Sequence, residues 1–460
     1  MYKMICIRAF VLLDRRWSIL LATVLVLCAG SEVETADPPP VVFSRDIAPV
    51  LRKHCLACHG KTKAEGDYRV DSFAMLKQPG ESDEPPFVPG EPQSSEIFRR
   101  ISSEDESERM PLEGDPLPAE LVKKMRQWIG AGAVYDREDP LLPLASIVPP
   151  VVHPFPPEHY SRAVPVMGLA LIRAADQLQL FAGGYRELLV FDPATGKLLR
   201  RIPNFPQRIY SIAPSKDATR LAVAGGNPGQ VGDVRILSIE SGEVTSVPMT
   251  YADVVLSVRW SPAGDAIAVA GSDGTVTMIS TNEMTTNWSR TVHKDWAKDV
   301  AFSPDGSQLV SVGFDRQVKL LAKKDGKELA EFTEHQNPVW SVTFARDGKS
   351  VFSADKSGRI FRWQVEDGKK IAQMRTNGTA FDLIASTSQL FVAAAGRRVT
   401  SFDLNSHKAA RQFTGPKGKM ISVVLDLEQE IAVSGSDQGE IVVWSTKSGK
   451  QTVSWSNAPP

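Results

Sequence analysis

Five consecutive residues, Cys55-Leu56-Ala57-Cys58-His59, have the types and spacing needed for specific chemistry. Two cysteines separated by two residues can each form a thioether with one vinyl group of a haem, and the histidine that follows then lies at the iron. The motif therefore predicts one covalently attached c-type haem. Cys55 and Cys58 would hold the cofactor, and His59 would be an axial ligand of its iron.

The same cysteines would also fit half of a zinc site or a redox-active C-x-x-C pair. A zinc site of this kind needs a second Cys/His pair, but the two other cysteines, Cys6 and Cys28, both lie within the first 30 residues. A thioredoxin-like pair needs a strand–helix–strand context, which the surrounding sequence lacks. Haem attachment is therefore the preferred interpretation.

Methionine is a typical sixth ligand for a haem that transfers electrons. Met110 is the best candidate, because it lies in a loop-rich segment and precedes Pro111, which stiffens the chain. Met75 and Met125 are alternatives, although Met125 falls on an apolar helix face and is expected in the core. We therefore predict that His59 and Met110 ligate the iron.

Two amphipathic helices are expected to position these residues. Apolar residues at i, i+3 and i+4 within 47–51 form a helical face that leads directly to Cys55. Ser44 is expected to cap the start of this helix. A second apolar helical face covers residues 121–129 and ends at Gly130. Two helices flanking a looped middle are the usual framework of a small haem domain.

The first 30 residues have the pattern of a signal peptide for export. A basic start is followed by the uncharged run Ile19–Ala29, which is too short to span a bilayer. Small residues just before Ser31 favour cleavage there, which would leave only the two motif cysteines and no structural disulfide. Two alternatives tether the protein to a membrane: a lipid on Cys28, or retention of the leader as an anchor. A periplasmic location agrees with covalent haem, which is attached outside the cytoplasm.

The 460-residue chain is long enough for two or more domains. Its net charge of −1 hides an asymmetry, because residues 31–140 carry a net charge of −8 and residues 141–460 carry +4. The acidic part would repel nucleic acid and could favour a basic redox partner. Basic residues elsewhere are scattered, so nucleic-acid binding is not expected.

The Pro-rich stretch 137–160 is a predicted linker between a haem domain at 41–136 and a second domain at 161–456.

The second domain is repetitive. Similar turn sequences at Trp260–Gly264, Phe302–Gly306 and Phe344–Gly348 follow one another at intervals of 42 residues, and each precedes an apolar strand. A period near 42 with four short strands per repeat predicts a β-propeller. Seven blades are expected, beginning near residues 166, 208, 254, 296, 338, 379 and 420.

Histidines in the repeats are expected to be structural rather than catalytic. His335, Ser353 and Trp363 fit the hydrogen-bonded His/Ser/Asp/Trp set of one repeat, with Ser357 at the aspartate position. His293 fits the same position of another repeat. The chain contains none of the serine-hydrolase, zinc-protease or phosphate-loop motifs. An electron-transfer protein is therefore expected rather than a catalyst.

Two family resemblances accompany these patterns. Residues 43–60 and the Arg109-Met110-Pro111 run resemble the planctomycete-type cytochrome c domain, and the repeats resemble the WD-repeat family. In the first family the methionine of the Met-Pro pair is the expected axial ligand, which agrees with Met110. Gly66-Asp67-Tyr68 departs from the usual Gly-Gly-Leu, and Leu112 replaces a common proline. Neither departure is expected to touch a haem ligand.

The resemblances imply a multidomain protein: a small all-α cytochrome c-like haem domain followed by an all-β seven-bladed WD-repeat propeller. The first hypothesis is an exported cytochrome that passes single electrons to a redox partner protein and uses its propeller to bind a protein partner. One alternative is a scaffold whose haem senses redox state or a diatomic gas. The other is a haem-fed oxidoreductase with its substrate in the propeller channel.

Overall fold

The computed structural model describes most of the chain after its N-terminal segment. The described residues are 40–56, 58–60, 64–112, 115–142, 144–147, 152–174, 177–251, 253–415 and 418–459. The predicted signal peptide, with Cys6, Cys28 and the cleavage site before Ser31, lies outside them. Within these ranges, no helix has both the length and the apolar character needed to cross a membrane.

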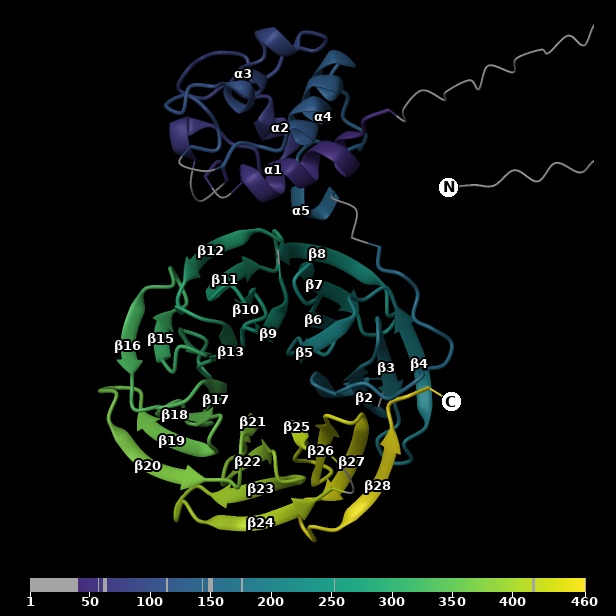
Figure 1. Cartoon of the computed structure of the whole chain (residues 1–460), viewed down its shortest axis with the longest axis vertical. Coiled ribbons are helices and arrows are strands. Elements are labelled where there is room, and N and C mark those ends of the chain that lie inside the picture. Colours follow the sequence, from purple (N-terminus) through teal and green to yellow (C-terminus); the bar gives the residue numbers. More distant parts are fainter. Residues whose placement is uncertain are drawn as a thin grey trace, which may run out of the picture. The chain divides into compact units, whose positions relative to one another are not determined.

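The first part of the described chain is helical (Figure 1). A π-helical turn at Phe43–Ile47 runs directly into the first α-helix. The α-helices of this part are α1 (Ala48–His54), α2 (Phe73–Leu76), α3 (Glu96–Ser102), α4 (Ala119–Gly130) and α5 (Leu144–Ile147).

Aromatic side chains form the centre of the helical core. Phe43 contacts Phe73 and Trp128, with ring centroids 5.0 and 5.3 Å apart, and Phe73 stacks on Tyr135 at 4.3 Å. The indole N–H of Trp128 donates to the carbonyl of Val134 at 2.9 Å, so this buried donor is satisfied. The core thereby joins the start of the domain to the end of α4.

The core also includes residues that follow the expected end of the haem domain. Leu144 and Ile147 of α5 are buried in the helical core, although the sequence places them in the Pro-rich linker. The backbone N–H of Leu144 donates to the carbonyl of Asp71 at 2.9 Å. Helix α5 within that stretch is therefore packed structure rather than a free spacer.

Ser44 does not cap α1, contrary to the expectation from sequence. It lies inside the π-helical turn, and its hydroxyl and backbone N–H both donate to the Asp136 carboxylate. The hydrogen bonds lower the pKa of Asp136, although burial opposes them. The serine thus ties the start of the domain to the segment after α4, a contact that local sequence does not reveal.

The second part is a seven-bladed β-propeller, as the sequence predicts (Figure 1). Each blade is a four-stranded antiparallel sheet made of four consecutive strands, the first of which is the innermost. The first blade contains β1 (Leu169–Ala174), β2 (Gln177–Gly183), β3 (Glu187–Phe191) and β4 (Leu198–Pro203). The second contains β5 (Arg208–Pro214), β6 (Arg220–Asn227), β7 (Val231–Ser238) and β8 (Val244–Tyr251).

The remaining five blades follow the same order. The third contains β9 (Val255–Trp260), β10 (Ala266–Gly271), β11 (Thr275–Ser280) and β12 (Thr286–Thr291), and the fourth β13 (Ala297–Phe302), β14 (Gln308–Gly313), β15 (Val318–Ala322) and β16 (Glu328–Phe332). The fifth contains β17 (Val339–Phe344), β18 (Ser350–Asp355), β19 (Arg359–Gln364) and β20 (Lys370–Arg375). The sixth contains β21 (Ala380–Ala385), β22 (Gln389–Ala394), β23 (Arg398–Asp403) and β24 (Ala409–Thr414). The last contains β25 (Met420–Asp426), β26 (Ile431–Ser436), β27 (Glu440–Ser445) and β28 (Gln451–Ser456).

Both predicted structural histidines occupy buried hydrogen-bonded positions. His293 contacts Ser311 through Nε2 and Asp315 through Nδ1, each at 2.9 Å. In the next blade His335 contacts Ser353 through Nε2 at 2.8 Å. Because these imidazoles are enclosed and paired, they serve the fold rather than a reaction.

The aspartate partner of His335 differs from the sequence assignment. Nδ1 contacts Asp355 at 3.1 Å, and Ser357 instead donates to that carboxylate at 2.6 Å. In the preceding blade the acid follows the serine by four residues, whereas here Asp355 follows Ser353 by two. Ser357 does occupy the aspartate position of the repeat, 42 residues after Asp315, but Asp355 supplies the acid because a carboxylate at either spacing can reach Nδ1.

The ring closes without exchange of a strand between the first and last blades. The hydroxyl of Ser422 donates to the carbonyl of Val166 at 2.7 Å, and the Val166 N–H donates to Ser436 at 3.0 Å. Gly435 makes this approach possible, because a Cβ at that residue would lie 2.5 Å from the side chain of Val166. At the C-terminus the Asn457 side chain donates to the carbonyl of Val164.

Candidate haem site

Helix α1 delivers the first cysteine of the motif to the edge of the helical core. The Cys55 N–H donates to the carbonyl of Leu51 at 3.0 Å, which continues the helical pattern past the end of α1. The N–H groups of Cys58 and His59 then donate to the Cys55 carbonyl at 3.2 and 3.0 Å. A tight turn therefore presents the motif, and all three side chains are half-buried.

The returning chain orients the histidine. The Nδ1 of His59 lies 3.3 Å from the backbone carbonyl of Tyr68, which can only accept a hydrogen bond. This contact places the proton on Nδ1 and leaves the lone pair of Nε2 for a metal. The N–H of Val70 also donates to the His59 carbonyl at 2.8 Å, so the backbone is held on both sides of the imidazole.

The environment of the thiols argues against a redox-active cysteine pair. Burial raises the pKa of the Cys55 thiol to about 12, and the nearby Cys58 adds to the shift. Reactive C-x-x-C pairs have a thiol whose pKa is lowered instead, because the thiolate is the nucleophile. No disulfide joins the two cysteines. The pair therefore has the character expected of attachment points rather than of a dithiol catalyst.

The described residues do not form a zinc site either. Across the described ranges, no group of three or more His, Cys, Asp or Glu side chains gathers closely enough to hold a metal ion. One histidine beside two thiols leaves too few protein donors for a closed zinc site. The same set suits a cofactor that brings most of its own metal ligands, as a porphyrin does.

The predicted sixth ligand, Met110, also lies at the edge of the helical core. Met110 and Cys55 are both half-buried and pack against the same set of buried residues. The Met110 N–H donates to the carbonyl of Arg100 at 3.0 Å, which fixes the loop against the end of α3. The rival Met125 is almost fully buried within α4 and is part of the core.

Tyr68 is the site residue that sequence reasoning missed. Its carbonyl contacts His59, its ring lies edge-on to the imidazole with centroids 5.6 Å apart, and its hydroxyl donates to Leu76. The expectation that the Gly66-Asp67-Tyr68 departure lies away from the haem ligands is therefore wrong. The departure itself was the available signal, because a half-buried tyrosine replaces a smaller aliphatic residue there. Burial raises the pKa of Tyr68 well above its usual range, so the hydroxyl stays protonated.

The linker histidine His153 has its hydrogen-bond partners in and beside the propeller. Its Nε2 contacts the buried carboxylate of Asp233 at 2.9 Å, and Arg235 donates to the same carboxylate at 2.8 Å. Its backbone N–H donates to the side chain of Asn204. His153 therefore anchors the chain to the second blade.

Comparison with known families agrees with this geometry. Residues 55–114 match the family described as planctomycete cytochrome C. Residues 243–280 and 285–320 match the WD domain, G-beta repeat, and residues 314–458 match a model described as outer membrane protein assembly factor BamB. A search of curated proteins found no matching relative.

The chain thus joins a planctomycete-type cytochrome c domain to a WD-repeat propeller. The cytochrome c match spans the cysteine motif, the His59–Tyr68 contact and Met110, and it indicates a haem-binding domain. The WD matches indicate a propeller that takes part in interactions. The overlap of two repeat models near residue 314 reflects the similar strand pattern of successive blades.

Proposed function

We propose that the chain is an exported c-type cytochrome that carries single electrons, with its propeller serving as a platform for a protein partner. In this proposal Cys55 and Cys58 hold one haem through thioether bonds, and His59 and Met110 ligate its iron. The observation that carries the proposal is the contact between His59 Nδ1 and the Tyr68 carbonyl, because it leaves Nε2 available for iron.

The residues around the proposed haem have separate tasks. A haem bound here supplies one-electron chemistry, and a thioether ligand raises its potential relative to a nitrogen ligand. The Tyr68 carbonyl keeps the imidazole in one orientation, and the Arg100 carbonyl holds the backbone of Met110. The two backbone contacts fix the ligands in advance, so little rearrangement is needed when the iron changes its oxidation state.

Export and a protein partner rest on different support. The leader has the pattern of a signal peptide, and covalent haem attachment takes place outside the cytoplasm. The two described families, planctomycete cytochrome C and outer membrane protein assembly factor BamB, favour an exported chain. The WD repeats favour a protein partner at the propeller. The mass of the purified exported protein would test cleavage before Ser31 and the addition of one haem.

Visible spectroscopy tests the ligands directly. The spectra of the parent protein, Met110→Ala and the matched control Met75→Ala would be recorded oxidised and reduced, with and without carbon monoxide. We expect the weak methionine–iron band of the oxidised parent to disappear in Met110→Ala and to persist in Met75→Ala. We also expect the reduced parent to resist carbon monoxide and Met110→Ala to bind it.

Other outcomes would overturn the proposal. Carbon monoxide binding by the parent would mean an open or labile sixth position, and would favour a gas or redox sensor over an electron carrier. Loss of the methionine band in Met75→Ala would move the sixth ligand to that residue. A parent protein that carries no haem would refute the function altogether.

A further inference from the structure

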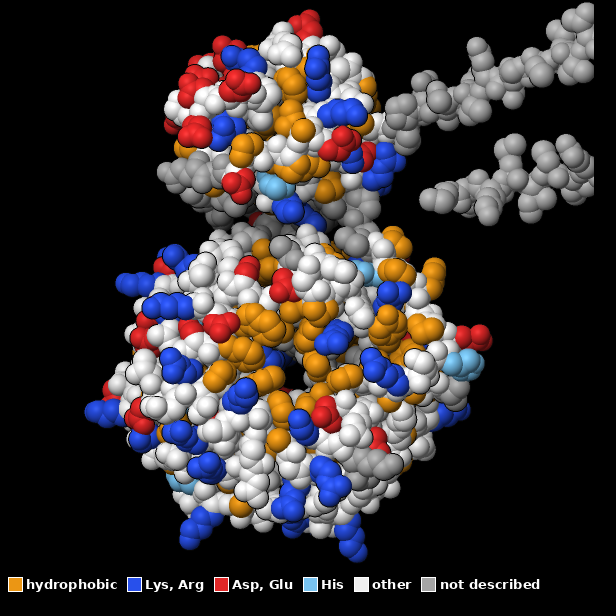
Figure 2. Space-filling view, viewed as in Figure 1, with side chains coloured by type: hydrophobic (Ala, Val, Ile, Leu, Met, Phe, Trp, Pro, Cys, Tyr) orange, Lys and Arg blue, Asp and Glu red, His pale blue; other side chains and the backbone are white. Residues whose placement is uncertain are grey.

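The axis of the propeller holds a large cavity that the proposed electron transfer does not use. Its volume is about 920 Å³, and it is lined by the innermost strands of all seven blades. This size lies within the range of small-molecule sites, roughly 300–1,000 Å³. On the face shown in Figure 2, hydrophobic side chains gather round the central opening, with basic side chains between them.

A repeated irregularity of the strands determines which side chains line this cavity. In six blades the innermost strand has a β-bulge near its start, and the bulged residue lines the cavity. Bulges redirect one side chain relative to a regular strand and are frequent beside functional sites. The six bulged residues are Tyr210, Leu256, Lys298, Trp340, Phe381 and Ile421, which we call the channel collar.

Aromatic rings form a continuous row on one side of the collar. The ring centroids of Trp296 and Phe314 are 5.3 Å apart, those of Phe314 and Trp340 are 5.2 Å apart, and those of Trp340 and Phe381 are 5.2 Å apart. Trp296 at the end of the row is 41% exposed. The planes of Trp296 and Phe314 are 18° apart, whereas Trp340 is tilted by 49° from Phe314 and by 87° from Phe381. The row therefore offers separate ring faces and edges against which a planar ring system can pack.

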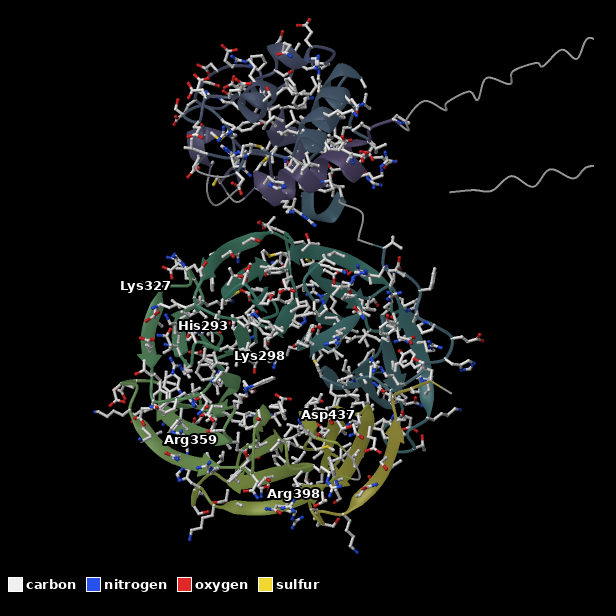
Figure 3. All side chains as sticks on the ribbon, viewed as in Figure 1. His293, Lys298, Lys327, Arg359, Arg398 and Asp437 are labelled. Carbon is white, nitrogen blue, oxygen red and sulfur yellow. The ribbon has the colours of Figure 1, made fainter. Side chains whose placement is uncertain are left out.

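Lys298 is the one charged member of the collar. Its ammonium lies 5.6 Å from the ring centroid of Trp340, and its side chain lies on the inner wall of the ring (Figure 3). Among the ion pairs of the described residues, none involves Lys298. Burial lowers the pKa of this lysine, although Asp299 and Asp382 oppose the shift. A cation in such a position favours an anionic partner.

The acids near Lys298 are occupied by other contacts. Asp299 accepts hydrogen bonds from Ser257 and Ser341 at 2.7 and 3.0 Å, and Asp382 accepts from the N–H of Val423 at 2.9 Å. These contacts join neighbouring blades to one another. The carboxylates therefore hold neighbouring blades together, and within the described residues neither of them forms a salt bridge with Lys298.

We propose that the channel binds a planar aromatic molecule with a negatively charged group, its rings against the Trp296–Phe381 row and its anionic group at Lys298. The cavity has the volume for such a ligand, the aromatic row supplies ring contact, and the lysine supplies a positive charge beside that row. This site is independent of the haem, so it stands or falls separately from the proposed electron transfer.

A matched pair of probes tests the proposal. 1-Anilinonaphthalene-8-sulfonate combines a planar naphthalene ring system with a sulfonate, and N-phenyl-1-naphthylamine has the same rings without the sulfonate. Binding of each to the full-length protein would be measured by titration calorimetry. We expect saturable binding of the anion at one site, with Lys298→Met weakening it by about ten- to hundredfold, as for loss of a hydrogen bond to a charged group. The neutral probe should bind more weakly and be unaffected by this variant.

Two further variants make the test specific. Trp340→Leu should weaken both probes, because it removes ring contact rather than charge. Lys327→Met is the matched control: Lys327 lies exposed in the turn before β16, at the outer edge of the ring (Figure 3), and its loss should leave both affinities unchanged. Lys298→Gln replaces Lys298→Met if the latter does not fold with parent-like circular dichroism.

Several results would contradict the proposed site. The proposal would be refuted if the parent protein did not bind the sulfonate saturably. It would also be refuted if the parent bound the neutral probe as tightly as the sulfonate. Equal affinity of the parent and both Lys298 variants for the sulfonate would remove the lysine from the site. An equal loss in Lys327→Met would show nonspecific binding of an anion to surface charge.

Discussion

Asp299 links three blades of the propeller, and replacing it should weaken the whole ring. One carboxylate oxygen accepts from the hydroxyl of Ser257 at 2.7 Å and the N–H of Val300 at 3.0 Å, and Arg259 donates to it at 3.2 Å. The other oxygen accepts from Ser341 at 3.0 Å and from a backbone N–H of the same strand at 3.2 Å. These five contacts make Asp299→Asn the most informative conservative substitution in the propeller.

The magnitude follows from the geometry of the amide. In either orientation its NH₂ group faces a buried backbone N–H, which loses its acceptor at a cost of about 1–3 kcal/mol. Arg259 also loses its carboxylate, but this side chain is one-third exposed, so that loss adds at most about 1 kcal/mol. The total is about 1–4 kcal/mol, which corresponds to a fall in Tm of roughly 2–7 °C for a domain of about 290 residues.

Thermal unfolding followed by circular dichroism measures this effect. Asp367→Asn is the control, because Asp367 accepts hydrogen bonds only within an exposed turn, and it should change stability by less than about 0.5 kcal/mol. A Tm for Asp299→Asn within about 1 °C of the parent would refute the reasoning, because it would mean that these contacts add no net stability.

Two further predictions concern the structural histidines. Gly313→Ala should lower Tm by several degrees in the same assay, because its Cβ would lie 2.5 Å from the imidazole of His293, and a parent-like Tm would show that the ring moves aside freely. For His335, burial lowers the folded-state pKa below the usual histidine value of about 6.5, although Asp355 opposes this. The unfolded chain then binds this proton more readily, so stability should fall as pH drops below about 6.5. The free energy of unfolding, measured with urea at several pH values in that range, should change less with pH for His335→Gln than for the parent. Equal pH dependence of the two proteins would contradict the assignment.

Much of the propeller could be predicted because its pattern is periodic. The 42-residue interval of the turn sequences and the apolar strands after them gave seven blades, and the structure contains them at the expected positions. Even the sixth blade, which lacks the turn sequence, keeps its strand pattern in β21 and β22. The period is a property of the local chain, so one sequence suffices to find it.

The errors share a different physical origin. Counting along the repeat puts Ser357 at the aspartate position and leaves His335 without an acid, but Asp355 makes that contact because a shorter spacing also reaches Nδ1. Ser44 was assigned to a helix cap, but it pairs with Asp136, which follows it by 92 residues. In both cases the partner of a short polar side chain depended on how the chain folds back, and local propensity does not contain that information.

The sequence alone predicted the chemistry of the N-terminal domain and determined the architecture of the second. The C-x-x-C-H motif fixes the residue types that a covalent haem requires, since thioether attachment depends on spacing within five residues. Met110 as sixth ligand stays a prediction that spectroscopy can test.

Only the tertiary structure decided which groups meet these residues. The Tyr68 carbonyl at His59 is a backbone acceptor, and a sequence pattern does not encode where a backbone group will point. The channel collar depends on six bulges, and a shift of register by one residue turns a side chain from one face of a strand to the other. Lys298 thus looks ordinary in the sequence, and its place in the channel follows from strand pairing across the whole ring.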